Sequence, residues 1–330
     1  MESLISATRP LASQVGGHAG VLTTEDGSLI IKPALPLELL FYQALNQNAE
    51  LEPLRPFLPK FFGTLKLEGQ IDENAIEEEG LVLTPLDIPE KDELSVLSIV
   101  LENLSYPFLK PNILDVKLGT VLYDEAATPD KIERMEQTAR ETTSHETGIR
   151  LTGFQMYDNN TSQPINTPKS YGKSIKPADL PEGIARFFAL GTEDGSSNTG
   201  LPRATVLPLL RSIREDIADI REIIASLEAR MVGMSLLIVY EADWALAAEG
   251  VKRLGLEADE EDEDDDDDDE DDDDDDESKR PGPPYVVKLI DFAHTRVTPG
   301  KGPDEGVVFG FDTVLRLLDG RIAQISESGQ

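Results

Sequence analysis

The chain has 330 residues and a mass of 36.2 kDa, enough for one large domain or two modest ones with a sizeable core. It has no cysteine, which excludes disulfides, thiolate zinc sites and a cysteine nucleophile and fits a reducing compartment. The formal net charge is -34, but a run of nineteen acidic residues from Asp259 to Glu277 carries more than half of it. A local anion-binding site is therefore compatible with the remaining chain. We expect no direct binding of nucleic acid.

The first residues lack the basic and apolar stretches of a signal peptide, and no apolar run reaches the roughly 18 residues that span a bilayer. We therefore expect an intracellular, soluble protein without a transmembrane segment. The first hundred residues predict a small sheet that carries one helix. Short apolar runs separated by turn residues predict strands within 21–31, 61–67 and 80–86, and residues 36–47 predict the helix.

The next informative stretch runs from Pro111 to Gly119 and has the sequence PNILDVKLG. In an extended segment Asp115 and Lys117 project to one face, while the leucine and valine residues around them project to the other. An adjacent carboxylate and ammonium suit phosphoryl transfer to an alcohol, because one accepts the hydroxyl proton and the other neutralises phosphoryl oxygens. On spacing alone, a solvated surface pair is the simpler interpretation.

Residues 129–140 have helical character and place Lys131 and Arg134 on one face, three residues apart. Polar and turn-forming residues predict loops over 158–170 and 191–203. Apolar residues that recur every three or four positions then predict one long amphipathic helix, beginning near Pro208 and reaching Met231.

Two apolar, β-branched runs at 235–241 and 285–291 predict neighbouring strands. Between them the acidic run cannot bury apolar surface and repels itself, so we expect a disordered insertion over about 257–284. Asp291 ends the second strand, a position from which one carboxylate can bind Mg²⁺ on nucleotide phosphates. His294 follows three residues later, and a structural role and a functional one are equally compatible with its position.

Three motifs together resemble the signature of the inositol polyphosphate kinase family. They are the Pro-x-x-x-Asp-x-Lys-x-Gly stretch from Pro111 to Gly119, the Ser-Leu-Leu that begins at Ser235, and Ile-Asp-Phe-Ala-His-Thr from Ile290 to Thr295. The resemblance implies an α+β, two-lobed kinase-like fold that binds ATP between its lobes. The β-rich N-lobe would comprise residues 1–104. The larger α/β C-lobe, residues 105–330, would carry a helical segment that binds inositol phosphates.

The resemblance also implies roles for individual residues, with ATP and Mg²⁺ as cofactors. Lys32 would hold nucleotide phosphates, with Glu38 as a partner, and the segment from Glu102 to Leu104 would be the hinge that contacts adenine. The implied catalytic residues are Asp115 and Lys117; the implied metal ligands are Asp291 and Ser235; the implied substrate contacts are Asp115, Lys117, Lys131, Arg134 and His294.

The hydrophobic residues within Asp-Val-Lys-Leu-Gly resemble those of the multikinases, and the sequel from Thr120 to Asp124 and the acidic run resemble fungal members. This resemblance implies action on inositol tris- and tetrakisphosphates at the 3- and 6-hydroxyls. The chain has Gln155 where animal multikinases carry an arginine. Two alternatives remain open. One is an inositol hexakisphosphate kinase. The other is a mainly non-catalytic nuclear protein whose acidic run binds basic proteins or transcription factors, so that both nucleus and cytoplasm are expected locations.

Overall fold

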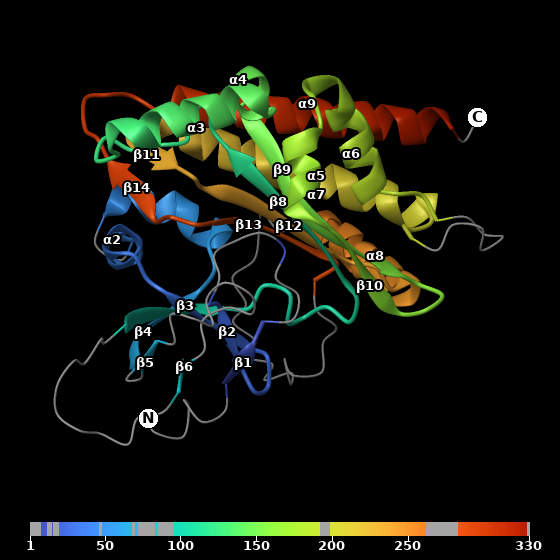
Figure 1. Ribbon diagram of the computed structural model, residues 1–330. Coiled ribbons are helices and arrows are strands. Elements are labelled where there is room, and N and C mark those ends of the chain that lie inside the picture. Colours follow the sequence, from blue (N-terminus) through green and yellow to red (C-terminus); the bar gives the residue numbers. More distant parts are fainter. Residues whose placement is uncertain are drawn as a thin grey trace.

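The computed structural model describes residues 8–11, 15, 20–45, 48–67, 70–71, 83–84, 96–191, 199–261 and 283–328. Two five-stranded sheets dominate it (Figure 1). Helices cover one face of the second sheet. Within the described ranges, no helix is both long enough and apolar enough to cross a membrane.

The first sheet has the strand order β1-β2-β3-β7-β4, and all its pairs are antiparallel. Its strands are β1 (Thr8–Pro10), β2 (Leu22–Thr24), β3 (Leu29–Pro33), β4 (Phe61–Leu67) and β7 (Val96–Glu102). The strand expected within 21–31 is therefore a hairpin, because the chain turns at Gly27 with a positive φ of 82°. Of the strand expected within 80–86, only β6 (Leu83–Thr84) is described, paired with β5 (Gln70–Ile71); the rest lies outside the described residues.

The second sheet has the order β10-β9-β8-β12-β13 and is also antiparallel throughout. Its strands are β8 (Pro111–Leu118), β9 (Ile149–Asp158), β10 (Gln163–Thr167), β12 (Ser235–Glu241) and β13 (Tyr285–Ile290). Strands β12 and β13 are neighbours, as expected, with Ser235 opposite Ile290. The loop expected over 158–170 is wrong, because β10 pairs with β9 there. The side chains of β10 are mostly exposed, so this strand lacks the apolar alternation that identifies a strand in a sequence.

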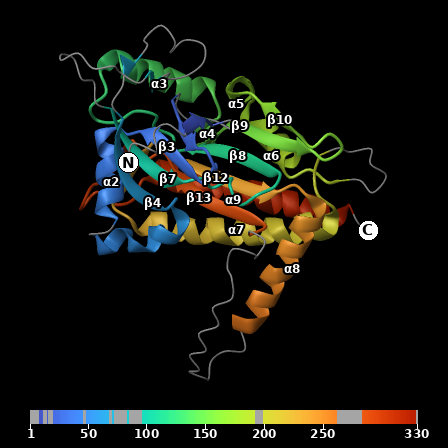
Figure 2. The same ribbon diagram turned by 90° about the horizontal axis from the view of Figure 1, so that it is seen from below.

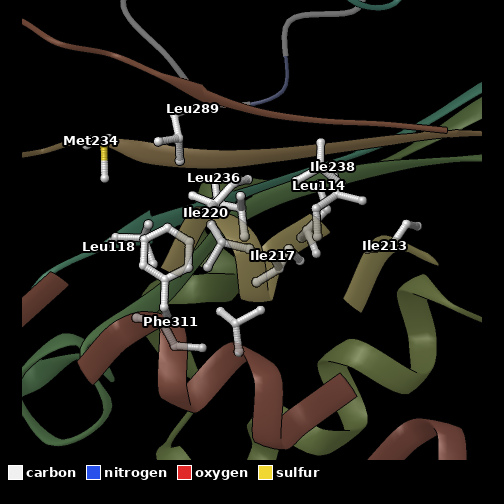
Figure 3. Packing of buried hydrophobic residues seen from close by; sticks show 14 of the residues in the cluster. Leu114, Leu118, Ile213, Ile217, Ile220, Met234, Leu236, Ile238, Leu289 and Phe311 are labelled. Carbon is white, nitrogen blue, oxygen red and sulfur yellow. The ribbon is translucent and has the colours of Figure 1, made fainter. Parts of the chain in front are cut away.

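Two long helices pack the second sheet into a common core (Figures 1 and 3). They are α7 (Arg203–Ser226) and α9 (Glu305–Glu327). Figure 3 shows the buried side chains that meet there, among them Ile213, Ile217 and Ile220 of α7, Leu114, Leu236 and Ile238 of the sheet, and Phe311 of α9.

Both predicted ends of the long helix are wrong. The helix begins five residues before Pro208 and continues through it, because the buried apolar stripe outweighs one missing backbone hydrogen bond. At the other end Met231 lies in β11 (Ala229–Val232), which pairs with β14 (His294–Val297). Met231 is buried in the same core, so its spacing matched the helical stripe although its backbone is extended.

Elements before residue 60 also enter the core of the second sheet. Helix α2 (Pro36–Ala44) ends three residues before the prediction, and the 3-10 segment η1 (Ala49–Phe57) follows it. The Phe41 ring stacks on Phe292 with centroids 4.1 Å apart. Leu51 and Leu54 of η1 lie in the same cluster. One apolar core therefore joins α2 and η1 to the second sheet, and the proposed division at residue 104 stays a prediction.

The remaining helices are shorter than α7 and α9. They are α3 (Pro129–Glu141), α4 (Ser144–Thr147), α5 (Lys169–Ser174), the 3-10 turn η2 (Pro177–Asp179), α6 (Leu180–Phe187) and α8 (Trp244–Glu261). Helix α8 extends away from the body of the molecule (Figure 2). It continues through residue 261, so the first residues of the expected insertion over 257–284 are helical. Residues 262–282, most of that insertion, lie outside the described residues.

Candidate active site

A cleft of about 830 Å³, part of it open to solvent, lies between the two sheets. Its apolar walls come from both sheets and include Ile30 and Leu101 on one side and Ile113, Leu237 and Val239 on the other. The expected hinge from Glu102 to Leu104 lines it, as do Lys32, Glu38 and Asp291. A mostly apolar cleft with a few charged groups at one end is typical of a small-molecule site.

The charged end of the cleft is one connected ion network. Lys32 Nζ lies 2.9 Å from Glu38 Oε1 and 2.8 Å from Asp291 Oδ1. Lys117 Nζ lies 2.6 Å from the other oxygen of Asp291 and donates a hydrogen bond of 2.8 Å to the Gly233 carbonyl. Lys32 comes from β3, Lys117 from β8 and Asp291 follows β13, so the network joins residues far apart in the sequence. The expected pairing of Lys32 with Glu38 is present.

Asp291 has an unusual backbone as well as an unusual charge environment. Its φ is 68°, in the left-handed region that residues other than glycine seldom adopt. Burial would raise the pKa of its carboxyl, but the ammonium groups of Lys117 and Lys32 hold that pKa well below its usual range. Burial by itself would lower the pKa of Lys32. The carboxylates of Asp291 and Glu38 outweigh this effect, so the pKa of Lys32 is raised overall. Asp291 is therefore a permanently charged carboxylate at neutral pH.

Asp115 lies on the same face of β8 as Lys117 and is 0% exposed. Its neighbours Leu114, Val116 and Leu118 face the apolar core, as the alternation predicted. Within the described residues, neither Asp115 oxygen meets a hydrogen-bond donor, and the buried hydroxyl of Ser235 on β12 also has no partner. Burial raises the pKa of Asp115 to about 6, against the opposing effect of Lys117. Such a carboxyl can accept a proton near neutral pH.

Two cationic residues near Asp115 were not predicted. Arg150 on β9 stands opposite Lys117 in the strand register, and its Nη1 is buried without a hydrogen-bond partner in the described parts of the chain. Lys169 begins α5, and its charge favours the ionised form of Asp115. A buried, unpaired donor such as Arg150 Nη1 beside a carboxylate fits an anionic ligand that accepts hydrogen bonds. No motif marks these residues, because sheet register and helix packing bring them to Asp115.

Comparisons with known proteins agree with this geometry. Residues 98–319 match the model of a family described as inositol polyphosphate kinase. The chain is 35% identical to the inositol polyphosphate multikinase of Saccharomyces cerevisiae, over 94% of this chain and 97% of that protein. It is 32% identical to the inositol polyphosphate multikinase of Schizosaccharomyces pombe, over 53% of this chain and 61% of the relative.

A solved structure is similar as well. It is the crystal structure of the inositol phosphate multikinase Ipk2 from S. cerevisiae in complex with ADP and Mn²⁺. The TM-score is 0.60 and the identity 29%, covering 89% of this chain and 99% of that one. The chain belongs to the inositol polyphosphate kinase family. The resemblance carried by the three motifs and the α+β, two-lobed kinase-like fold are confirmed.

The metal that this family membership implies fits the residues present. Within the described ranges no cluster of three or more acidic or histidine side chains could hold an ion. Magnesium, however, is commonly bound by one or two carboxylates together with substrate phosphates. Asp291 offers a charged carboxylate, and the unpartnered hydroxyl of Ser235 lies opposite Ile290, next to it. These two residues suit a metal held jointly with a nucleotide.

The other expected substrate residues of this inositol polyphosphate kinase lie further out. Lys131 and Arg134 are on α3, half-buried and exposed respectively, and neither has an ion-pair partner in the part of the chain described. His294 on β14 places its Nδ1 2.5 Å from Asp124 Oδ2, which ties the segment after β8 to β14. The structure thus joins Asp115, Lys117, Lys32 and Asp291 in one site. Contacts of Lys131, Arg134 and His294 with a substrate stay predictions.

Gln155 has a structural contact. It is buried on β9, and its Nε2 donates a hydrogen bond of 3.0 Å to the Pro111 carbonyl. It therefore ties β9 to the start of β8. Arg150, on the same strand, is the arginine beside Asp115.

Proposed function

We propose that this protein is an ATP-dependent inositol polyphosphate kinase that phosphorylates hydroxyls of inositol tris- and tetrakisphosphates. One observation carries the proposal: a buried carboxyl, Asp115, lies near the cations Lys117, Arg150 and Lys169, next to the ion network that ends the apolar cleft. A base surrounded by cations suits a hydroxyl on a polyphosphorylated ring. The multikinase names of the relatives and the ADP bound to the yeast enzyme support the same conclusion.

Each residue then has a chemical task. Asp115 accepts the proton of the attacking hydroxyl, because its raised pKa makes it a better base than an exposed carboxylate. Lys117 and Lys32 neutralise negative charge on the phosphoryl group as it moves. Arg150 and Lys169 hold phosphates of the acceptor. Catalysis of this type consists mainly of positioning and charge neutralisation.

Asp291 and Ser235 are the residues that would hold Mg²⁺. When bound, this ion neutralises charge on the nucleotide phosphates. Both oxygens of Asp291 contact lysines in the present structure. The carboxylate therefore already has the charge and the fixed orientation that a metal ligand needs.

The positions phosphorylated are proposed to be the 3- and 6-hydroxyls, in the fungal pattern. The test is incubation of the purified protein with ATP, Mg²⁺ and each of a panel of inositol phosphates, with chromatographic identification of products. We expect inositol tris- and tetrakisphosphates to be converted and inositol hexakisphosphate to remain. Pyrophosphate products from inositol hexakisphosphate would favour the alternative kinase. No turnover of any member of the panel would contradict the proposed function.

A second role is proposed for the acidic run. Helix α8 leads out of the body of the protein, and the run of nineteen acidic residues begins within its last three residues. Such a segment attracts basic proteins through charge alone, and this binding weakens steeply with salt. Basic nuclear proteins or transcription factors are the partners we propose, and location in nucleus and cytoplasm stays a prediction.

A further inference from the structure

We propose that the packing of α5 against β9 shapes the acceptor pocket, and that Gly172 is the positioning residue that allows it. The inference rests on the proposed function, because it concerns how the same pocket recognises the phosphates of its substrate. It is argued from the irregular stretch of β9 opposite Asp115, the close approach of α5, and the ring contact that packs α5 against β9.

Strand β9 is irregular where it passes Asp115. Leu151 pairs with Val116 and Gly153 pairs with Asp115, so Thr152 is an extra residue in β9. Such a bulge changes the direction of nearby side chains and is common beside active sites. The Thr152 hydroxyl is buried and, within the described residues, has no hydrogen-bond partner. The bulge therefore has an unpaired hydroxyl in the part of β9 that passes Asp115. Arg150, two residues earlier, has an unpaired Nη1 in the same stretch.

Helix α5 lies unusually close to this bulge. A methyl group built on Gly172 would overlap the carbonyl oxygen of Leu151, so the helix backbone touches the strand backbone there. At the start of the helix, a methyl group on Gly153 would lie 3.1 Å from the Thr167 carbonyl oxygen and 3.9 Å from the Lys169 amide nitrogen. Two close approaches, one at each end, thus fix the depth of α5 on β9.

Aromatic packing holds α5 in the same place from outside. The Tyr171 ring packs edge-on against Phe154 of β9, with centroids 5.8 Å apart and an interplanar angle of 88°. The guanidinium of Arg186 on α6 lies over both rings, 5.2 Å from Phe154 and 5.7 Å from Tyr171. Edge-to-face and cation–π contacts of this kind favour one orientation of the helix.

This packing determines where the acceptor-side cations lie. Lys169 is the first residue of α5, three positions before Gly172, and Arg150 precedes the carbonyl that Gly172 touches. A side chain at position 172 must push α5 and β9 apart, which displaces both cations from Asp115. Neither cation lines the nucleotide cleft. Displacement should therefore weaken recognition of the inositol phosphate and leave ATP recognition unchanged.

The experiment compares Gly172→Ala with Gly320→Ala, a helical glycine on α9 where an added methyl meets nothing within 4 Å. Binding of inositol trisphosphate is measured by calorimetry without ATP, and KM is measured for both substrates. We expect Gly172→Ala to weaken inositol trisphosphate binding about 10- to 100-fold, since small displacements of positioning groups have effects of this size. The KM for ATP should change less than about twofold, and Gly320→Ala should match the wild type.

A second pair of variants keeps the test informative if Gly172→Ala does not fold. Tyr171→Ala removes the ring that packs α5 on Phe154, and Tyr171→Phe keeps it. We expect the first to raise the KM for the inositol phosphate and the second to reverse most of that rise. Wild-type protein that binds no inositol trisphosphate would overturn the proposed function. Wild-type binding that Gly172→Ala and Tyr171→Ala both leave unchanged would overturn this inference alone.

Discussion

At the scale of single residues, Asp291 connects Lys32, which lines the cleft, to Lys117 through one carboxylate. Its left-handed backbone gives that carboxylate a direction that an ordinary extended residue would not give. Asparagine tolerates the same backbone well. An Asp291→Asn substitution should therefore remove the charge and preserve the local path of the chain.

The first prediction follows from this geometry. Asp291→Asn and Lys117→Ala should each lower kcat on inositol trisphosphate at least about 100-fold, as expected when preorganised charge is removed from a phosphoryl-transfer site. Circular dichroism should show that both variants remain folded. Arg214→Ala is a suitable control, since Arg214 pairs with Asp319 on the far helices. Near-normal turnover by either active-site variant would contradict the roles assigned.

The second prediction concerns the pH dependence of stability through Asp115. Its pKa is about 6 in the folded protein against an ordinary value of 3.8, so the folded state binds this proton more tightly. Stability is then lost as the pH rises from about 4 to about 6, and the shift corresponds to about 3 kcal/mol. An Asp115→Asn variant cannot titrate there.

The measurement is urea unfolding of wild type and Asp115→Asn at pH values from 4 to 7. Relative to the wild type, the variant should gain about 2.5 kcal/mol in free energy of unfolding over this range. All other titrating groups are shared by the two proteins and cancel in the difference. A difference that stays constant with pH would show that burial does not perturb this carboxyl.

At the scale of elements, α2 connects the nucleotide side of the cleft to the core. Its inner face carries Glu38, which pairs with Lys32, and Phe41, which stacks on Phe292 beside Asp291. One short helix thus supports two members of the ion network. The packing of α2 against the core should therefore decide whether the ion network of Lys32, Glu38 and Asp291 forms.

The third prediction is made for this helix. Phe41→Ala should lower the free energy of unfolding by about 3–5 kcal/mol, because it leaves a cavity in a buried cluster. Leu40→Ala on the same helix is the control: its side chain is 57% exposed, so the change should stay within about 0.5 kcal/mol. Chemical denaturation measures both. Equal losses for the two variants would contradict the packing described.

At the scale of the whole molecule, the acidic run interrupts a sheet without altering its pairing. Strands β12 and β13 pair from Ser235 with Ile290 to Tyr240 with Tyr285, although α8 and the acidic run separate them in sequence. The cost of closing a loop rises only slowly with its length, so this insertion is tolerated.

The fourth prediction separates the two proposed roles of the protein. Deletion of residues 262–278 preserves all of α8 and should leave kcat and KM within about twofold of the wild type, because the loop adds little to closure cost. Binding of a basic probe such as poly-lysine should be lost at low salt. A variant in which the acidic residues are replaced by serine and glycine controls for loop length. Loss of kinase activity on deletion would contradict the passive role of the run.

The sequence by itself determined the parts of this protein that depend on local pattern. Alternation along β8 placed Asp115 and Lys117 on one face, and three motifs in order identified the family. Apolar periodicity located α7 but not its ends. The exposed strand β10 escaped prediction because edge strands with polar side chains lack a distinct period.

Only the tertiary structure decided which charges meet. Lys32 of β3, Lys117 of β8 and Asp291 after β13 converge, and Arg150 reaches Asp115 through the register of β8 and β9. The position of Lys169 depends on how closely α5 approaches the bulge at Thr152. A sequence records spacing along the chain, whereas electrostatic energy depends on distance through space, and folding alone converts the first into the second.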